Sequence, residues 1–306
     1  MDRIIFPKPA WPLQALILLL GVSTFLAGLL LCFIPGMNAV RWFFAHTSFY
    51  LLSILFLLWL RAIISSISKI RPSTNTIFTT ILLSGTALAL TISIFIINPP
   101  AFRLHNDETA LLGTSQSLAR EQTVFIPWEA VLCSSKLIII HTALPKRPLL
   151  FPFLTSLLHE LKGYVPDNAF ILNFFILFTL LALIGNFFTY HWGKAAGFAI
   201  QCAVVSHPIL WHTSASGISD LLNILFFFLS TLALWRHIRA PSAESLTLLV
   251  LTLCLCAHSR YESILFIPVT LVFLVAWRKI SRKNIRESLP SLIIAAICCL
   301  PLFWQR

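Results

Sequence analysis

Residues 169–189 read AFILNFFILFTLLALIGNFFT and contain no Asp, Glu, Lys or Arg. A helix needs about 20 apolar residues to cross the ~30 Å hydrocarbon core of a bilayer. A helix of a soluble protein would alternate this apolar face with a polar one, which this stretch lacks. The stretch is therefore predicted to cross a membrane.

Similar apolar runs recur along the whole chain. Of its 306 residues, 58% are hydrophobic and 11% are charged, roughly half the charged fraction of an ordinary soluble domain. We predict an all-α integral membrane protein with about nine spanning helices, the first being a retained signal anchor. The spans are placed near residues 13–34, 45–64, 77–97, 169–189, 195–211, 219–235, 244–258, 262–277 and 288–304. The stretch 244–277 is read as two short spans or as one re-entrant hairpin.

Basic residues cluster in the short connections between these runs. The formal net charge of +11 is therefore attributed to membrane orientation and not to nucleic-acid binding. Threading the spans from a cytoplasmic N-terminus places most short-loop cations inside and most acidic residues outside. The inside cations are Arg61, Lys69, Arg71, Lys194, Arg236, Arg239, Arg278, Lys279, Arg282, Lys283 and Arg286. We expect a multi-pass protein of the inner (plasma) membrane.

The segment 98–168 is too polar to span and is placed on the outer, periplasmic or extracellular, side. Loops of this length are usually functional. One stretch in it has helical spacing of leucines and phenylalanine, opposed by Thr155, Ser156, His159, Glu160 and Lys162. It is predicted to be a helix that lies in the membrane interface with its apolar side down. A second helix is predicted from Asp107 to Glu121.

Polar residues gather at the same outer surface. They are His105-Asn106-Asp107-Glu108, Lys146-Arg147-Pro148, Ser216-Gly217-Ile218-Ser219-Asp220 and Arg260-Tyr261-Glu262. Adjacent carboxylates can supply a general base and a second acid or metal ligand. Ionisable residues near the membrane are costly and are therefore functional candidates.

The order and shared side of these motifs resemble the C-type polytopic membrane glycosyltransferases. The nearest likeness is to the branch of dolichyl-phosphate-mannose protein mannosyltransferases and aminoarabinose transferases. The resemblance covers residues 77–306, a core of seven spans that includes the loop 98–168, while residues 1–76 supply two additional spans. Since such enzymes usually continue with further spans, the chain is read as a fragment or a minimal member.

The resemblance implies a role for each candidate residue. Asp107 would deprotonate or orient the acceptor in an inverting transfer, with Glu108 as its acidic partner. Substrate binding, including contact with the donor phosphate, would involve Lys146, Arg147, Asp220, Arg260 and Glu262. Structural alternatives remain open: helix capping for the acids, lipid head-group contact for the cations, and a simple Arg260–Glu262 pair.

Together these features predict a membrane glycosyltransferase that takes a sugar from a polyprenyl-phosphate carrier. The expected partners are this donor, membrane lipids, and a lipid, polysaccharide or protein acceptor. No cofactor is identified: a divalent metal at the acidic pair is not indicated, and His207, His212 and His258 match no ligand spacing. The rival interpretations are a transporter or lipid flippase, which would favour paired broken helices that the sequence lacks, and a non-catalytic membrane subunit.

Overall fold

The computed structural model describes residues 37–68, 74–103, 106–133, 136–277, 279 and 281–304. The predicted span 13–34 lies outside them. The elements, in chain order, are α2 (Met37–Ile67), α3 (Thr74–Ile97), α4 (Asn106–Glu121), β1 (Ile126–Cys133), β2 (Lys136–Ala143), α5 (Leu150–Lys162), α6 (Asn168–Trp192), α7 (Lys194–Val205), α8 (Pro208–Ser214), α9 (Asp220–Arg239), α10 (Ala243–Ala257), the 3-10 turn η1 (Tyr261–Leu265), α11 (Phe266–Ala276) and α12 (Arg282–Trp304).

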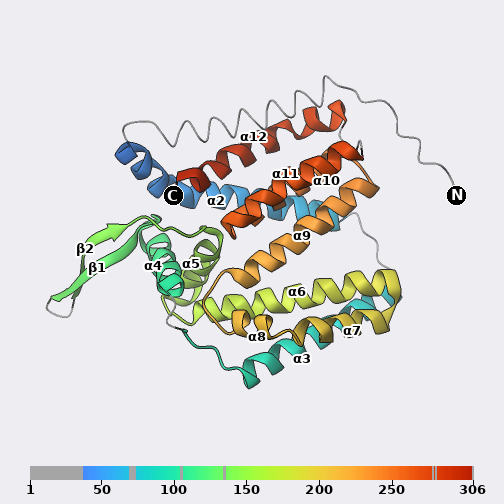
Figure 1. Ribbon diagram of the computed structural model, residues 1–306, viewed down its shortest axis with the longest axis horizontal. Coiled ribbons are helices and arrows are strands. Elements are labelled where there is room, and N and C mark those ends of the chain that lie inside the picture. Colours follow the sequence, from blue (N-terminus) through green and yellow to red (C-terminus); the bar gives the residue numbers. More distant parts are fainter. Residues whose placement is uncertain are drawn as a thin grey trace.

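The long helices lie side by side and run alternately between two ends of a bundle (Figure 1). We call the end that carries α4, α5 and the β-strands the loop end. The other end, where α2, α6 and α9 finish, carries Arg61, Lys194, Arg236 and Arg239 and is called the basic end. In the interior, α10 packs against α2, α9 and α12, and most of its side chains are buried.

Within the residues that the structure describes, five helices are long and apolar enough to cross a membrane. They are Arg41–Ile67, Thr74–Ile97, Asn168–Trp192, Asp220–Arg239 and Arg282–Leu302, and they identify a multi-pass membrane protein. The predicted span 195–211 is interrupted, because α7 ends at Val205 and α8 begins at Pro208, whose ring excludes an uninterrupted helix. With 12 residues, α7 covers roughly 18 Å, well short of a bilayer core. The number of nine spans therefore stays a prediction.

Both helices predicted in the outer loop are confirmed, as α4 and α5, but the predicted division of the α5 faces is wrong. Thr155, Ser156 and His159 are buried, whereas Leu161 is 81% exposed. The His159 ring explains this, because Asn168 Nδ2 donates to its Nδ1 (2.8 Å) and Ser115 Oγ contacts its Nε2 (3.1 Å). Burial lowers the pKa of His159, which favours the neutral ring that this bonding needs. The polar side of α5 thus packs against α4 and α6.

The outer loop also holds an element that the sequence analysis did not predict. Strands β1 and β2 pair antiparallel and project from the helices as a hairpin (Figure 1). A signal was present, because β2 contains Ile138, Ile139, Ile140 and Thr142 and follows Ser134-Ser135, and β1 before it contains Ile126, Trp128 and Val131. The helical class of the protein is confirmed, and the hairpin is an addition to it.

Candidate functional site

The first part of the site is an ion pair between two segments of the outer loop. Asp107 lies in the first turn of α4, and Arg147 lies between β2 and α5. The guanidinium binds the carboxylate through two bonds, Nε to Oδ1 (2.9 Å) and Nη2 to Oδ2 (2.6 Å). Both side chains are 44% exposed, so the pair is open to a ligand from one side.

Arg260 is the centre of the second part. It follows α10 and precedes η1, and its Nη1 donates to Oδ1 of Asp220 (2.5 Å) while its Nε donates to Oε2 of Glu262 (3.3 Å). Asp220 is the first residue of α9. One turn further along α9, the hydroxyls of Ser259 and Ser263 contact Oδ1 of Asn223 at 2.8 and 2.5 Å. These contacts fix the start of α9 against the turn after α10.

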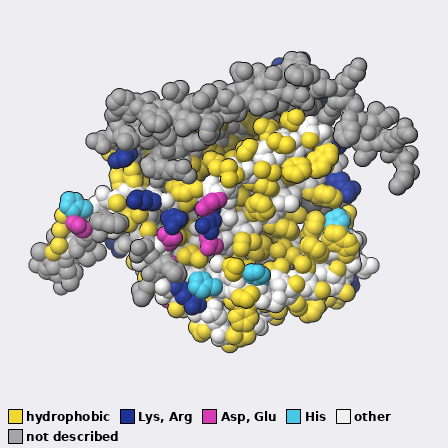
Figure 2. Space-filling model, in the orientation of Figure 1, with side chains coloured by type: hydrophobic (Ala, Val, Ile, Leu, Met, Phe, Trp, Pro, Cys, Tyr) yellow, Lys and Arg dark blue, Asp and Glu magenta, His cyan; other side chains and the backbone are white. Residues whose placement is uncertain are grey.

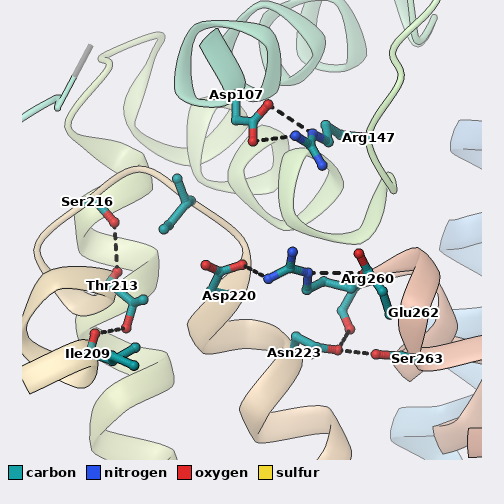
Figure 3. A network of polar contacts seen from close by, with 12 residues as sticks. Asp107, Arg147, Ile209, Thr213, Ser216, Asp220, Asn223, Arg260, Glu262 and Ser263 are labelled. Atoms are coloured by element: carbon teal, nitrogen blue, oxygen red, sulfur yellow. Dashed lines mark hydrogen bonds and ion pairs between the residues drawn. The ribbon is translucent and has the colours of Figure 1, made fainter. Parts of the chain in front are cut away.

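The two parts belong to one polar cluster (Figure 3). The main chain joins them, because Leu150 N, at the start of α5, donates to the carbonyl of His258 at the end of α10 (3.0 Å). The pKa of Glu262 is lowered, chiefly by a hydrogen bond from its own backbone N–H against an opposing effect of burial, and also by Arg260 and Arg147. In the space-filling view, charged side chains of both signs gather in a largely apolar surface (Figure 2).

Glu108 occupies a different environment from its neighbour Asp107. Its side chain is fully buried, and its oxygens accept the backbone N–H groups of Arg103 (2.7 Å) and Gly217 (2.8 Å). The two adjacent carboxylates therefore do not converge on one point. Lys146 lies exposed at the surface next to Arg147.

Among the described residues, no group of three or more His, Cys, Asp or Glu side chains could hold a metal ion. The structure shows the surroundings of two of the three histidines that the sequence analysis named. His258 is buried, with its Nε2 bonded to the carbonyl of Cys298 (2.8 Å), and His207 precedes the first turn of α8.

Asn223, Ser263 and Asn173 are the polar residues of this region that the sequence analysis missed. The Nδ2 of buried Asn173 donates to the carbonyl of Ser216 (2.6 Å) and so holds the turn before α9. Asn223 follows Asp220 by three residues, so helical spacing places both on one face and could have identified it. No sequence signal connects Asn173 with the turn at 215–219.

Comparison with known proteins identifies the family. Residues 146–304 match the family described as dolichyl-phosphate-mannose-protein mannosyltransferase. The match includes both arginines of the site and starts after Asp107 and Glu108, so it is narrower than the range 77–306 expected from the motifs. No curated protein and no solved structure matches the chain. Because the match covers more than half of the sequence, the chain belongs to the dolichyl-phosphate-mannose-protein mannosyltransferase family, which consists of membrane glycosyltransferases.

Proposed function

We propose that the chain transfers a sugar from a polyprenyl-phosphate carrier to an acceptor hydroxyl or phosphate, with inversion at the anomeric carbon. The observation that carries this proposal is the placement of Arg147 and Arg260. Each guanidinium is held by a carboxylate from another segment, Asp107 for Arg147 and Asp220 for Arg260, at one end of an apolar bundle. This end lies where the head group of a lipid donor would reach the protein while its chain stays in the apolar phase.

The phosphate that leaves the sugar explains why the site would need two arginines. When the bond between the anomeric carbon and the phosphate oxygen breaks, its electron pair stays on that oxygen and negative charge grows there. Fixed donors aimed at such charge stabilise the transition state. A guanidinium has five N–H donors, and the contacts with carboxylates described above use two of them in Arg147 and two in Arg260. Both side chains therefore have donors left for phosphate oxygens, with Lys146 as a further exposed cation.

Asp107 supplies the base in this proposal. Its carboxylate accepts the proton of the acceptor hydroxyl while the acceptor oxygen bonds to the anomeric carbon on the side opposite the phosphate. Each of its oxygens has a second lone pair beyond the one that Arg147 occupies. The half-exposed position of the side chain leaves room for an acceptor.

Arg147 is shared between Asp107 and the donor phosphate. A phosphate would bind the remaining N–H groups of a guanidinium whose charge is already partly offset by Asp107, so the two anions compete for the charge of Arg147. Donor binding then loosens Asp107 for contact with the acceptor. This competition predicts that the charge of Asp107 weakens donor binding.

The test uses the purified chain in detergent with polyprenyl-phosphate sugars labelled in the sugar, and with a membrane lipid extract, polysaccharide and peptides as acceptors. We expect labelled product, with its anomeric configuration inverted by NMR. A transporter or flippase would leave every donor intact in detergent. Failure to convert any donor in the presence of all acceptor classes would overturn the proposed function.

We also propose that the site faces the outside of the cell. Single cysteines placed at Asn106 and Arg282, in a chain freed of its native cysteines, test this with a thiol reagent that does not cross membranes. The reagent should label position 106 in intact cells and position 282 only after the cells are opened. The reverse pattern would invert the topology.

A further inference from the structure

Glu108 joins two segments that lie far apart in the sequence. Its Oε2 accepts the N–H of Arg103, in the chain that leaves α3, and its Oε1 accepts the N–H of Gly217, in the turn that leads into α9. The side chain is fully buried. A carboxylate is costly to bury unless hydrogen bonds compensate for the lost water, and both oxygens have such a bond here.

The turn that Glu108 binds leads directly into the second part of the site. Gly217 precedes Asp220 by three residues, and Asp220 holds Arg260. The same turn is bonded by Asn173 from α6, and Ala101 N donates to the carbonyl of Ala215 (3.1 Å). Glycine fits closely at 217, because an added Cβ would lie 3.1 Å from the ring of Phe102 and require a shift of a few tenths of an ångström.

Asp107 and Glu108 thus act on opposite sides of the start of α4. Consecutive helical residues point roughly 100° apart, so one carboxylate reaches the surface and the other reaches the interior. The first meets Arg147, and the second meets the turn before Asp220. The start of α4 is therefore connected to both arginines of the site. Asp107 binds Arg147 directly, and Glu108 binds the N–H of Gly217 in the turn before Asp220, which binds Arg260.

We propose that Glu108 is a positioning residue that sets the separation between the Asp107–Arg147 pair and the Asp220–Arg260–Glu262 group. This inference rests on the proposed function, in which the first pair meets the acceptor and both arginines meet the donor phosphate. If the hydrogen bonds of Glu108 to Arg103 and Gly217 are weakened, each ion pair stays formed, but the distance between the Asp107–Arg147 pair and the Asp220–Arg260–Glu262 group is no longer fixed. The expected signature is a loss of turnover with donor affinity retained.

Glu108→Gln is the main variant. The glutamine keeps the size of the side chain but has only one acceptor oxygen, and its NH₂ group would face one of the two N–H donors. We expect kcat to fall about 10- to 100-fold, as for a lost positioning contact, with the donor Kd within about threefold. Hydrogen exchange should rise in the peptides that contain Arg103 and Gly217, and this measurement needs no substrate.

Gly217→Ala alters the residue that donates the hydrogen bond to Glu108. The added methyl group would crowd the Phe102 ring at 3.1 Å, in the turn whose N–H binds Glu108, without changing any charge. We expect a smaller loss of kcat of the same kind. In the double variant the two effects should combine to less than their product, because both remove one interaction.

Gln201→Met is the control for general destabilisation. Gln201 is fully buried and bonds Thr86 and the carbonyls of Leu83 and Leu181, within the bundle formed by α3, α6 and α7. The Gln201→Met substitution should lower the melting temperature while leaving kcat within about twofold at a temperature where the protein is folded.

The outcomes separate the two proposals. Unchanged kcat in Glu108→Gln, or losses that only follow the fraction of folded protein, would overturn the positioning role. Unchanged hydrogen exchange in both peptides would show that Glu108 does not hold the segments of Arg103 and Gly217 together, whether or not the chain is active. An unmodified chain that transfers no sugar would overturn the proposed function and the positioning role that rests on it.

Discussion

The two ends of the helical bundle use arginine in different ways. At the loop end, Arg147 and Arg260 are each bonded to carboxylates at 2.5–3.3 Å. At the basic end, the guanidinium of Arg239 lies over the ring of Trp235, 4.5 Å from its centre. There the ion pair of Lys283 and Glu287 is separated by 4.0 Å, with the lysine side chain 82% exposed.

Under the proposed function, helix orientation needs only cationic charge, whereas a binding site needs charge at a fixed place. Arg239 contacts an aromatic ring, an arrangement expected of a cation near a membrane surface. The ion pairs of the loop end are more than a third exposed, and such pairs contribute about 0–1 kcal/mol to stability. Their removal should therefore change activity much more than folding, and the predictions below test this contrast.

Asp107→Asn should have the largest effect. Asparagine keeps the shape of the side chain but cannot take the acceptor proton, so transfer should fall by about 10²- to 10⁴-fold. Donor affinity should rise several-fold, because Arg147 loses its competing carboxylate. Transfer assays and donor titrations on the purified variant measure both effects.

Asp167→Asn is the matched control for this substitution. Asp167 is exposed at the start of α6, on the same end of the bundle, and lies outside the polar cluster. Its variant should keep transfer within about twofold. If Asp107→Asn also stays within a few-fold of the parent, Asp107 is a structural partner of Arg147 and not the base.

Arg147→Ala should have the next largest effect, on donor binding. Hydrogen bonds to charged groups contribute about 1.5–3 kcal/mol, which corresponds to roughly a 10- to 100-fold weaker donor Kd. Lys162→Ala, which removes an exposed cation at the end of α5, should leave the donor Kd nearly unchanged. Equal donor affinity in the two variants would remove Arg147 from the site.

Asp220→Asn should act more weakly, because Arg260 keeps its bond to Glu262. The loss of one partly exposed ion pair is about 1 kcal/mol or less, so we expect kcat to fall up to about fivefold. Glu160→Gln, at an exposed position on α5, is the control and should have no effect. A loss beyond 10²-fold would instead mean that Asp220 touches the reacting groups.

The sequence predicted what depends on local composition. Apolar runs identified the five helices of the described part of the chain that are long and apolar enough to cross a membrane, and the motifs placed Asp107, Arg147, Asp220 and Arg260 on one side. The sequence analysis named the Arg260–Glu262 pair, whose residues lie two positions apart. It could not predict the pairs Asp107–Arg147 and Asp220–Arg260, because each joins residues 40 positions apart, and their meeting depends on how the helix ends pack. Nor could it separate buried Glu108 from exposed Asp107, since adjacent acids in a first turn have the same sequence signature.

The polar face of α5 shows the same limit. Helical spacing correctly predicted the helix, yet His159 and Ser156 are buried. Ser115 of α4 and Asn168 of α6 bond the His159 ring, and the hydroxyl of Ser156 donates to the carbonyl of Phe153 in its own helix. A periodic pattern shows which residues share a face but not what covers that face. The hairpin was missed for a different reason: a membrane interpretation of the outer loop gave weight to helical spacing alone.

Arg239→Gln, at the basic end, should have the smallest effect. The side chain contacts Trp235 at a membrane surface, and an exposed cation–π contact contributes about 0.5–1 kcal/mol. Its removal leaves Arg61, Lys194 and Arg236 to keep the orientation, so transfer should stay within about twofold and thiol labelling at position 282 should not change. Arg147→Gln, the same substitution at the loop end, is the comparison and should weaken donor binding at least 10-fold. If Arg239→Gln reduced donor affinity as much as Arg147→Gln does, fixed carboxylate partners would not be what distinguishes a binding arginine from an anchoring one in this protein.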